Sequence, residues 1–125
     1  MTLVDASLSI SEAAERTGLS THTLRYYERE GLMLDGVERA PSSHRRYSDA
    51  DIGWVEFLTK LRSTAMPIAR VREYVDLVRE GEDSTPARLA LLLAHRDAVV
   101  AQLEEMQNSL AAIDFKIATY RKGKS

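Results

Sequence analysis

The segment Ser20–Gly31 places several side chains that can hydrogen-bond to phosphates and base edges at helical spacing. On a helix, Leu24 and Tyr27 fall on one side and the polar groups fall on the other. The polar groups are two guanidiniums, a phenol, an imidazole and two hydroxyls, contributed by Thr21, His22, Thr23, Arg25, Tyr26 and Arg29. This face is a candidate DNA-binding surface. A solvated basic helix face would have the same composition, so the neighbouring segments must decide between the two interpretations.

The residues around this segment predict two short helices joined by a tight turn. Ser20 is a suitable N-cap, and Gly31 suits the left-handed residue that often follows a helix. Upstream, Ser9 and Glu12 have capping-box spacing, and the helix that they open ends at Gly18. This pattern is typical of a helix-turn-helix, whose second helix normally enters the major groove. Helical hairpins with a glycine turn are also common in α-proteins of other kinds.

A basic loop follows the helical pair. Val37–Arg39 and His44–Tyr47 could pair as a small hairpin around the turn residues Pro41–Ser43. Such a hairpin would suit a wing that touches the phosphate backbone, and a solvated charged loop is the alternative. The candidate wing residues are His44, Arg45, Arg46 and Tyr47.

Two further helices and a linker are predicted next. Ser48 caps a helix over Asp49–Ser63, and Pro67 opens a helix that runs to about Glu80. Trp54 is expected in the core or at a domain interface. Gly81–Pro86 is a short polar linker. We therefore expect a DNA-binding domain with a linking helical pair over residues 1–80, and a linker with a dimerisation helix over residues 81–125.

The last helix carries an apolar seam. Apolar positions recur there at alternating steps of three and four, which is the heptad pattern of a coiled coil. The seam positions that we assign to dimerisation are Leu92, Val99, Leu103, Met106, Leu110, Ile113 and Ile117. Arg96 interrupts the pattern once. A second copy of the chain is the simplest partner for this seam, and a helix folded back on its own domain is the alternative.

The composition excludes several classes of site. The chain has 125 residues, a net charge of −2 and no cysteine, so disulfides, thiolate metal sites and thiol-based sensing are absent. The three histidines lack metal-ligand spacing, and no catalytic constellation is present, so we expect no metal, no cofactor and no enzyme activity. No signal peptide or membrane-spanning run is found, and a cytoplasmic protein is the default.

In combination, these segments resemble the MerR family of bacterial transcription regulators. The resemblance covers nearly the whole chain. Its motifs are Ile10–Ala14, Gly18–Ser20, Thr23–Glu28 with Gly31–Leu32, His44–Ser48, and Met66–Tyr74 before a terminal coiled-coil helix. It implies a mainly α fold, in which a winged helix-turn-helix DNA-binding domain is followed by a long C-terminal dimerisation helix that forms an antiparallel coiled coil.

The resemblance also implies a mechanism and partners. Family members bind a two-fold symmetric operator as homodimers, and effector binding distorts the promoter so that its −35 and −10 elements realign for RNA polymerase. Arg25 and Tyr26 should lie at the DNA, and Tyr27 should face inward. Arg45 should be the wing contact, with Arg46 and Tyr47 in support.

The sequence names no small-molecule effector, which would bind near the base of the coil if there is one. The chain has none of the cysteines of metal-sensing members, and only Arg121–Ser125 follows the coil in this sequence, where drug-sensing members carry a large C-terminal domain. An architectural, excisionase-like accessory DNA-binding protein is the alternative function, and the long seam favours a regulator.

Overall fold

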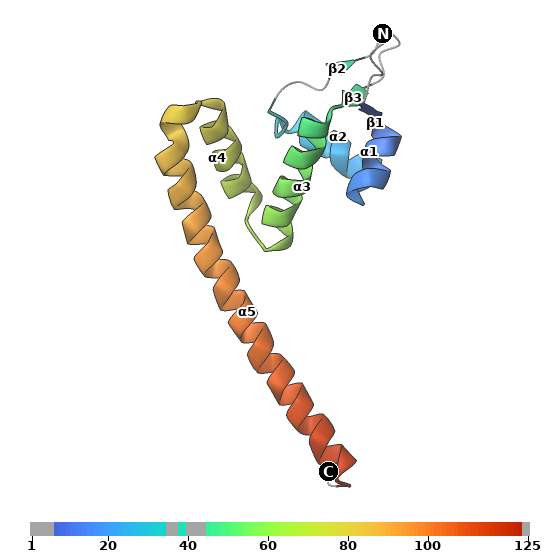
Figure 1. Cartoon of the computed structure of the whole chain (residues 1–125), viewed down its shortest axis with the longest axis vertical. Helices are drawn as coiled ribbons and strands as arrows, with labels where there is room; N and C mark the ends of the chain where they lie inside the picture. Colours follow the sequence, from blue (N-terminus) through green and yellow to red (C-terminus); the bar gives the residue numbers. More distant parts are fainter. Residues whose placement is uncertain (1–6, 35–37, 40–44, 124–125) are drawn as a thin grey trace, which may run out of the picture. The chain divides into compact units, whose positions relative to one another are not determined.

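The computed structural model describes residues 7–34, 38–39 and 45–123, and its contacts divide the chain into two units, Met1–Arg88 and Leu89–Ser125. Most of the described residues are helical, as Figure 1 shows. The first unit contains a small sheet and four helices, and the second is the greater part of one long helix. The elements of the first unit are β1 (Leu8–Ser9), α1 (Ile10–Thr17), α2 (Thr21–Arg29), β2 (Glu38–Arg39), β3 (Arg45–Tyr47), α3 (Asp49–Ser63), α4 (Ile68–Arg79) and the 3₁₀ turn η1 (Glu82–Ser84).

Side-chain caps set the ends of α1 and α2, as the sequence predicts. The Ser9 hydroxyl accepts a hydrogen bond from the Glu12 N–H at 3.2 Å, and the Ser9 N–H donates to the Glu12 carboxylate at 3.0 Å. Gly18 ends α1 with a φ of +75°. The Ser20 hydroxyl accepts from the Thr23 N–H at 3.0 Å and opens α2.

A Schellman motif ends α2. Gly31 adopts a φ of +70°, its N–H donates to the Glu28 carbonyl, and the Leu32 N–H donates to the Tyr27 carbonyl at 2.9 Å. The chain therefore turns sharply after α2 and sends Leu32 into the core, where only 1% of its surface is exposed.

The sheet has three strands with β3 in the centre. Both neighbours run antiparallel to β3, with Leu8 opposite Tyr47 on one side and Glu38 opposite Arg46 on the other. The predicted hairpin is confirmed for β2 and β3, while Val37 and residues 40–44 lie outside the described residues. Strand β1 was not predicted, because two residues directly before a capping box carry no strand signal of their own.

The core of the first unit lies between the helices and the sheet. Helix α1 packs against α2, α3 and the sheet, and α3 packs against α4. The largest side chains with almost no exposed surface are Leu24, Leu32, Tyr47, Val55, Leu58, Met66, Val71 and Val75. Trp54 lies at the edge of this core, with its ring stacked on Tyr74 at a centroid distance of 5.9 Å. The helices bury one apolar face each, made by Ile52, Val55, Leu58 and Leu61 in α3 and by Val71, Tyr74 and Val75 in α4. Phe57 of α3 remains exposed.

The connection between α3 and α4 is a second Schellman turn, formed without glycine. Met66 N–H donates to the Leu61 carbonyl at 2.9 Å, and Ala65 occupies the left-handed position with a φ of +73°. A residue with a Cβ is strained in that conformation, so the buried side chain of Met66 is obtained at some cost in backbone energy.

The predicted polar linker is an ordered turn. Ser84 is buried, and its hydroxyl donates to the carbonyls of Leu77 and, at 2.7 Å, Gly81. Arg88 donates to the Ser84 hydroxyl at 3.1 Å and to the Gly81 carbonyl at 3.0 Å. The first unit therefore extends through the linker to Arg88, beyond the expected domain boundary after residue 80.

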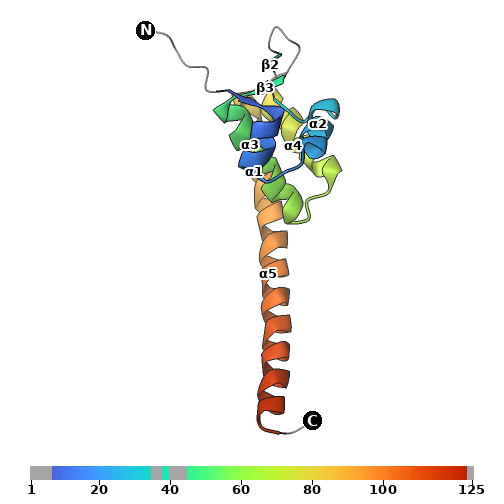
Figure 2. The same cartoon turned by 90° about the vertical axis from the view of Figure 1, so that its right-hand side faces the viewer.

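The last helix, α5 (Thr85–Arg121), is continuous, as Figure 2 shows. Its first residue is Thr85, so the last two residues of the predicted linker Gly81–Pro86 belong to the helix. At 1.5 Å per residue it is about 55 Å long. Among the described helices, none is long and apolar enough to cross a membrane.

Candidate nucleic-acid interface

Helix α2 has the two faces that the sequence predicts. Leu24 is fully buried and Tyr27 is 6% exposed, so both anchor the helix in the core. On the other face the polar side chains are exposed or half-buried, and they are Thr21, His22, Thr23, Arg25, Tyr26 and Arg29. The face is held in place because its helix is capped at both ends and packed through Leu24 and Tyr27.

Within this face, the residues differ in their solvent exposure and in their contacts with the rest of the chain. His22, Arg25 and Arg29 are exposed, whereas Tyr26 is half-buried with its ring 6.2 Å from that of Tyr27. The Thr23 hydroxyl lies 3.0 Å from the Ser20 hydroxyl and so takes part in the N-terminal cap. The guanidiniums of Arg25 and Arg29 are therefore the groups most available to a phosphate backbone. Their DNA contacts remain predictions.

The structure revises the wing assignments at two positions. Tyr47 has no exposed surface, so its side chain belongs to the core and is not available to DNA in this fold. Arg46 is half-buried, and its guanidinium donates to the Ser7 hydroxyl at 3.1 Å and to the Ser7 carbonyl at 2.5 Å. The central strand β3 thus uses Arg46 to hold the segment that leads into β1. Both residues therefore support the wing, which is the role that the resemblance implies for them.

The DNA contacts predicted for the other two wing residues stay predictions. Arg45 opens β3 and is paired in register with Arg39 of β2, at the outer end of the hairpin. His44 lies outside the described residues. Arg45 therefore remains the candidate wing contact, and it comes from the strand that Arg46 and Tyr47 fix in place.

The second unit leaves its apolar seam uncovered within the single chain. Leu103, Leu110 and Ile113 are 56–57% exposed, Met106 is 70% exposed and Ile117 is 42% exposed. Leu92 and Val99 are half-buried. Large apolar side chains repeated at heptad spacing along one exposed helix are typical of a surface that a partner helix covers. The distal seam from Leu103 onward is the candidate protein-interaction surface.

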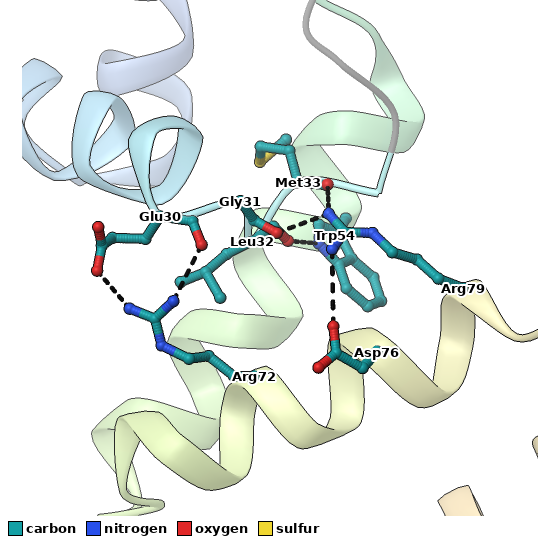
Figure 3. Close-up of polar contacts among 8 residues, drawn as sticks. All are labelled: Glu30, Gly31, Leu32, Met33, Trp54, Arg72, Asp76 and Arg79. Carbon is teal, nitrogen blue, oxygen red and sulfur yellow. Dashed lines mark hydrogen bonds and ion pairs between the residues drawn. The ribbon is translucent and has the colours of Figure 1, made fainter.

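Two further arginines lie close to the candidate DNA-binding helix, and sequence reasoning missed their role. Arg72 and Arg79 of α4 contact the C-terminal end of α2 and the residues that follow it (Figure 3). Their spacing of two helical turns puts them on one face of α4. Nothing in the sequence indicates that this face meets α2, because the contact joins residues far apart in the chain.

No candidate metal centre is found in the part of the chain that the structure describes. There, no group of three or more His, Cys, Asp or Glu side chains could hold a metal ion. The available chemistry is that of exposed cations and hydrogen-bond donors on α2, which suits recognition of a polyanion.

Comparison with known proteins identifies similar chains. A family model described as MerR HTH family regulatory protein matches residues 8–77. An HTH-type transcriptional regulator of Haemophilus influenzae is 33% identical over 115 residues, covering 92% of this chain and 84% of that protein. The HTH-type transcriptional regulator AdhR of Bacillus subtilis is 37% identical over 93 residues, covering 74% and 66%. The crystal structure of HiNmlR, a MerR family regulator lacking the sensor domain and bound to promoter DNA, matches with a TM-score of 0.87 at 31% identity, covering 93% of this chain and 87% of that one.

Proposed function

Because this chain belongs to the MerR family of helix-turn-helix regulators, which are DNA-binding proteins and not enzymes, we propose that it binds promoter DNA as a homodimer and controls transcription by distorting the duplex. The observation that carries the proposal is the combination, in one chain, of a capped helix with an exposed basic face and a long helix with an uncovered heptad seam. The first reads DNA and the second joins two copies.

The DNA-binding part of the proposal rests on α2 and the wing. As the second helix of a helix-turn-helix, α2 would lie in the major groove with Arg25 and Tyr26 toward the DNA. Arg25 and Arg45 would contact phosphates, while the neighbouring polar side chains of α2 would meet base edges. The promoter-bound state of HiNmlR supports promoter DNA as the ligand class.

The dimer part rests on the seam. Burial of a side chain such as Leu or Ile contributes roughly 1.5–3 kcal/mol, and in a symmetric pair each position is buried twice. The most exposed seam residues are distal, from Leu103 to Ile117. An antiparallel pairing of two distal halves would place a DNA-binding domain at each end, which fits an operator with two half-sites.

Control of transcription would then follow from the shape of the bound DNA, with RNA polymerase as the partner at the promoter. A chain without cysteine has no thiolate to bind soft metals or react with electrophiles, so any effector would be held by packing and hydrogen bonds. The accessory, excisionase-like alternative is not favoured, because the matching regulators cover α5 as well as the DNA-binding domain.

The test is to select duplexes from a random-sequence library with the purified chain and to measure the bend of the selected duplex by fluorescence energy transfer between its ends. We expect a palindromic sequence and a bend on binding. If the selected duplexes share no sequence, the chain is not a sequence-specific regulator. If the bound duplex is straight, the chain does not control transcription by distortion.

A further inference from the structure

The backbone carbonyls that follow α2 are held by side chains from α3 and α4. Arg72 donates to the Glu30 carbonyl at 3.1 Å, Arg79 donates to the Gly31 carbonyl at 2.6 Å and also to that of Met33, and Trp54 donates to the Leu32 carbonyl at 2.7 Å. Figure 3 shows these donors converging on one short stretch of backbone. Four consecutive carbonyls, those of residues 30–33, are thus each bound by a side chain from another helix.

These contacts also match the electrostatics of a helix end. The C-terminus of α2 carries partial negative charge, and its last carbonyl groups lack partners within the helix. The Schellman turn already occupies the carbonyls of Tyr27 and Glu28, so the arginines bind the carbonyls just beyond them. Guanidinium groups suit this place, because they are cationic and present several N–H donors in one plane. Here the guanidiniums come from α4 and not from α2 itself, so the helix end is fixed relative to a different element.

Arg72 adds a side-chain contact next to the DNA-binding face. Its guanidinium also binds the Glu30 carboxylate, one helical turn after Tyr26. The hydrogen bond to Glu30, with a smaller contribution from the Tyr26 phenol, raises the pKa of Arg72 above its ordinary value. Arg79 is in turn 3.8 Å from Asp76 on its own helix. We call Arg72 and Arg79 the arginine clamp.

We propose that the arginine clamp positions α2 for DNA recognition, so that the orientation of the reading helix depends on α4. The inference rests on the proposed function and extends it, because it assigns specificity to residues that need not touch DNA. A shift of α4 would be transmitted to α2 through the bonds to residues 30–33. The DNA-binding face of α2 is therefore linked directly to helices α3 and α4.

The test compares Arg72→Gln and Arg79→Gln with Arg70→Gln as the matched control. Arg70 is on the same helix and pairs with Glu73 at 2.8 Å, within α4. Binding is measured by fluorescence anisotropy on the duplex selected by the wild-type chain and on a random duplex, over a range of salt. We expect the clamp variants to lose about tenfold in affinity for the selected duplex, with little change on the random one and an unchanged salt slope. The control should stay within about twofold of wild type.

A second readout does not involve DNA. Amide hydrogen exchange at Gly31 and Leu32 reports the turn that ends α2, and it should accelerate in the clamp variants but not in the control. If the wild-type chain selects no duplex, the proposed function fails while this measurement still tests the clamp. Unchanged exchange in both clamp variants would overturn the inference.

Two further outcomes complete the test. If the clamp variants weaken both duplexes equally and flatten the salt slope, the arginines contact phosphates directly and the positioning role is wrong. If Arg72→Gln does not fold, two charge-exchange variants replace it. They are the single variant Arg72→Glu and the double variant Glu30→Arg/Arg72→Glu. Recovery of binding by the double variant supports the clamp, and a double variant as weak as the single one overturns it.

Discussion

Replacing Leu110 by aspartate puts a carboxylate within the distal seam of α5. In the single chain 56% of the Leu110 surface is exposed, and this is the part that a partner would cover. Full burial of a leucine is worth roughly 1.5–3 kcal/mol, so covering that part contributes about 1–1.5 kcal/mol per copy and about 2–3 kcal/mol in a symmetric pair. The aspartate also brings a charge that an apolar seam cannot solvate, at about 1–3 kcal/mol or more per copy.

The combined effect on the dimer is on the order of 5 kcal/mol, which raises the dimer dissociation constant by about three to four orders of magnitude. Sedimentation equilibrium over a range of protein concentrations measures that constant. Asn108→Asp is the matched control, since it adds the same charge nearly opposite Leu110 on the same helix, at an exposed position. The control should dimerise like the wild type, and the thermal unfolding of the DNA-binding domain should be unchanged in both variants.

A Leu110→Asp chain that dimerises as tightly as the wild type would refute this reasoning. The distal seam would then have no part in self-association, and its exposure in the single chain would need another partner. A monomeric wild-type chain at micromolar concentration would refute the homodimer directly.

Three other changes test separate parts of the structure. Arg25→Ala should weaken binding to all duplexes and lower the salt slope by about one unit, because one phosphate contact is lost; titrations at several salt concentrations measure this. Ala65→Gly should raise the free energy of unfolding by roughly 0.5–1 kcal/mol, because glycine relieves the strain of the positive φ at a smaller entropic cost. Denaturant unfolding measures this free energy, and a less stable variant would contradict the prediction. The capping hydrogen bonds from Ser9 lower the pKa of Glu12 below its ordinary value of 4.5, so its contribution to stability is present above that pH and is lost as the pH falls through the lowered value. Glu12→Gln should lose this part of the pH dependence in thermal melts, and a variant with the wild-type profile would show that the cap is not its source.

Local signals predicted the helices well. The hydroxyls of Ser9, Ser20 and Ser48 open α1, α2 and α3 as their spacing indicates, because a cap acts within three residues of itself. The mainly α fold, with a winged helix-turn-helix domain and a long C-terminal helix, is confirmed, and so is the inward position of Tyr27. The pairing of α5 with a second copy stays a prediction.

Some features that the sequence could not predict are contacts between distant residues, and others are local turns without the usual residue signals. Arg46 looks like a DNA-binding cation in the sequence, and only the register of β1 on β3 shows that Ser7 takes its guanidinium. The sequence alone allows Tyr47 to be an exposed aromatic side chain of the wing. Its burial follows from the packing of the sheet on the helices. Ala65 carries no glycine signal for its turn, and the linker is ordered by the burial of Ser84, which a polar composition does not reveal.

The most direct test of the central claim is a hydroxyl-radical footprint of the wild-type chain on its selected duplex, with the stoichiometry measured on the same complex. If the chain binds its operator as a homodimer, we expect two chains per duplex and two protected half-sites related by a two-fold axis, with the protection on one side of the duplex. We also expect that the Leu110→Asp chain gives no such footprint at the same concentration. A single protected half-site bound by one wild-type chain, or a footprint that the Leu110→Asp chain reproduces, would contradict the dimeric regulator.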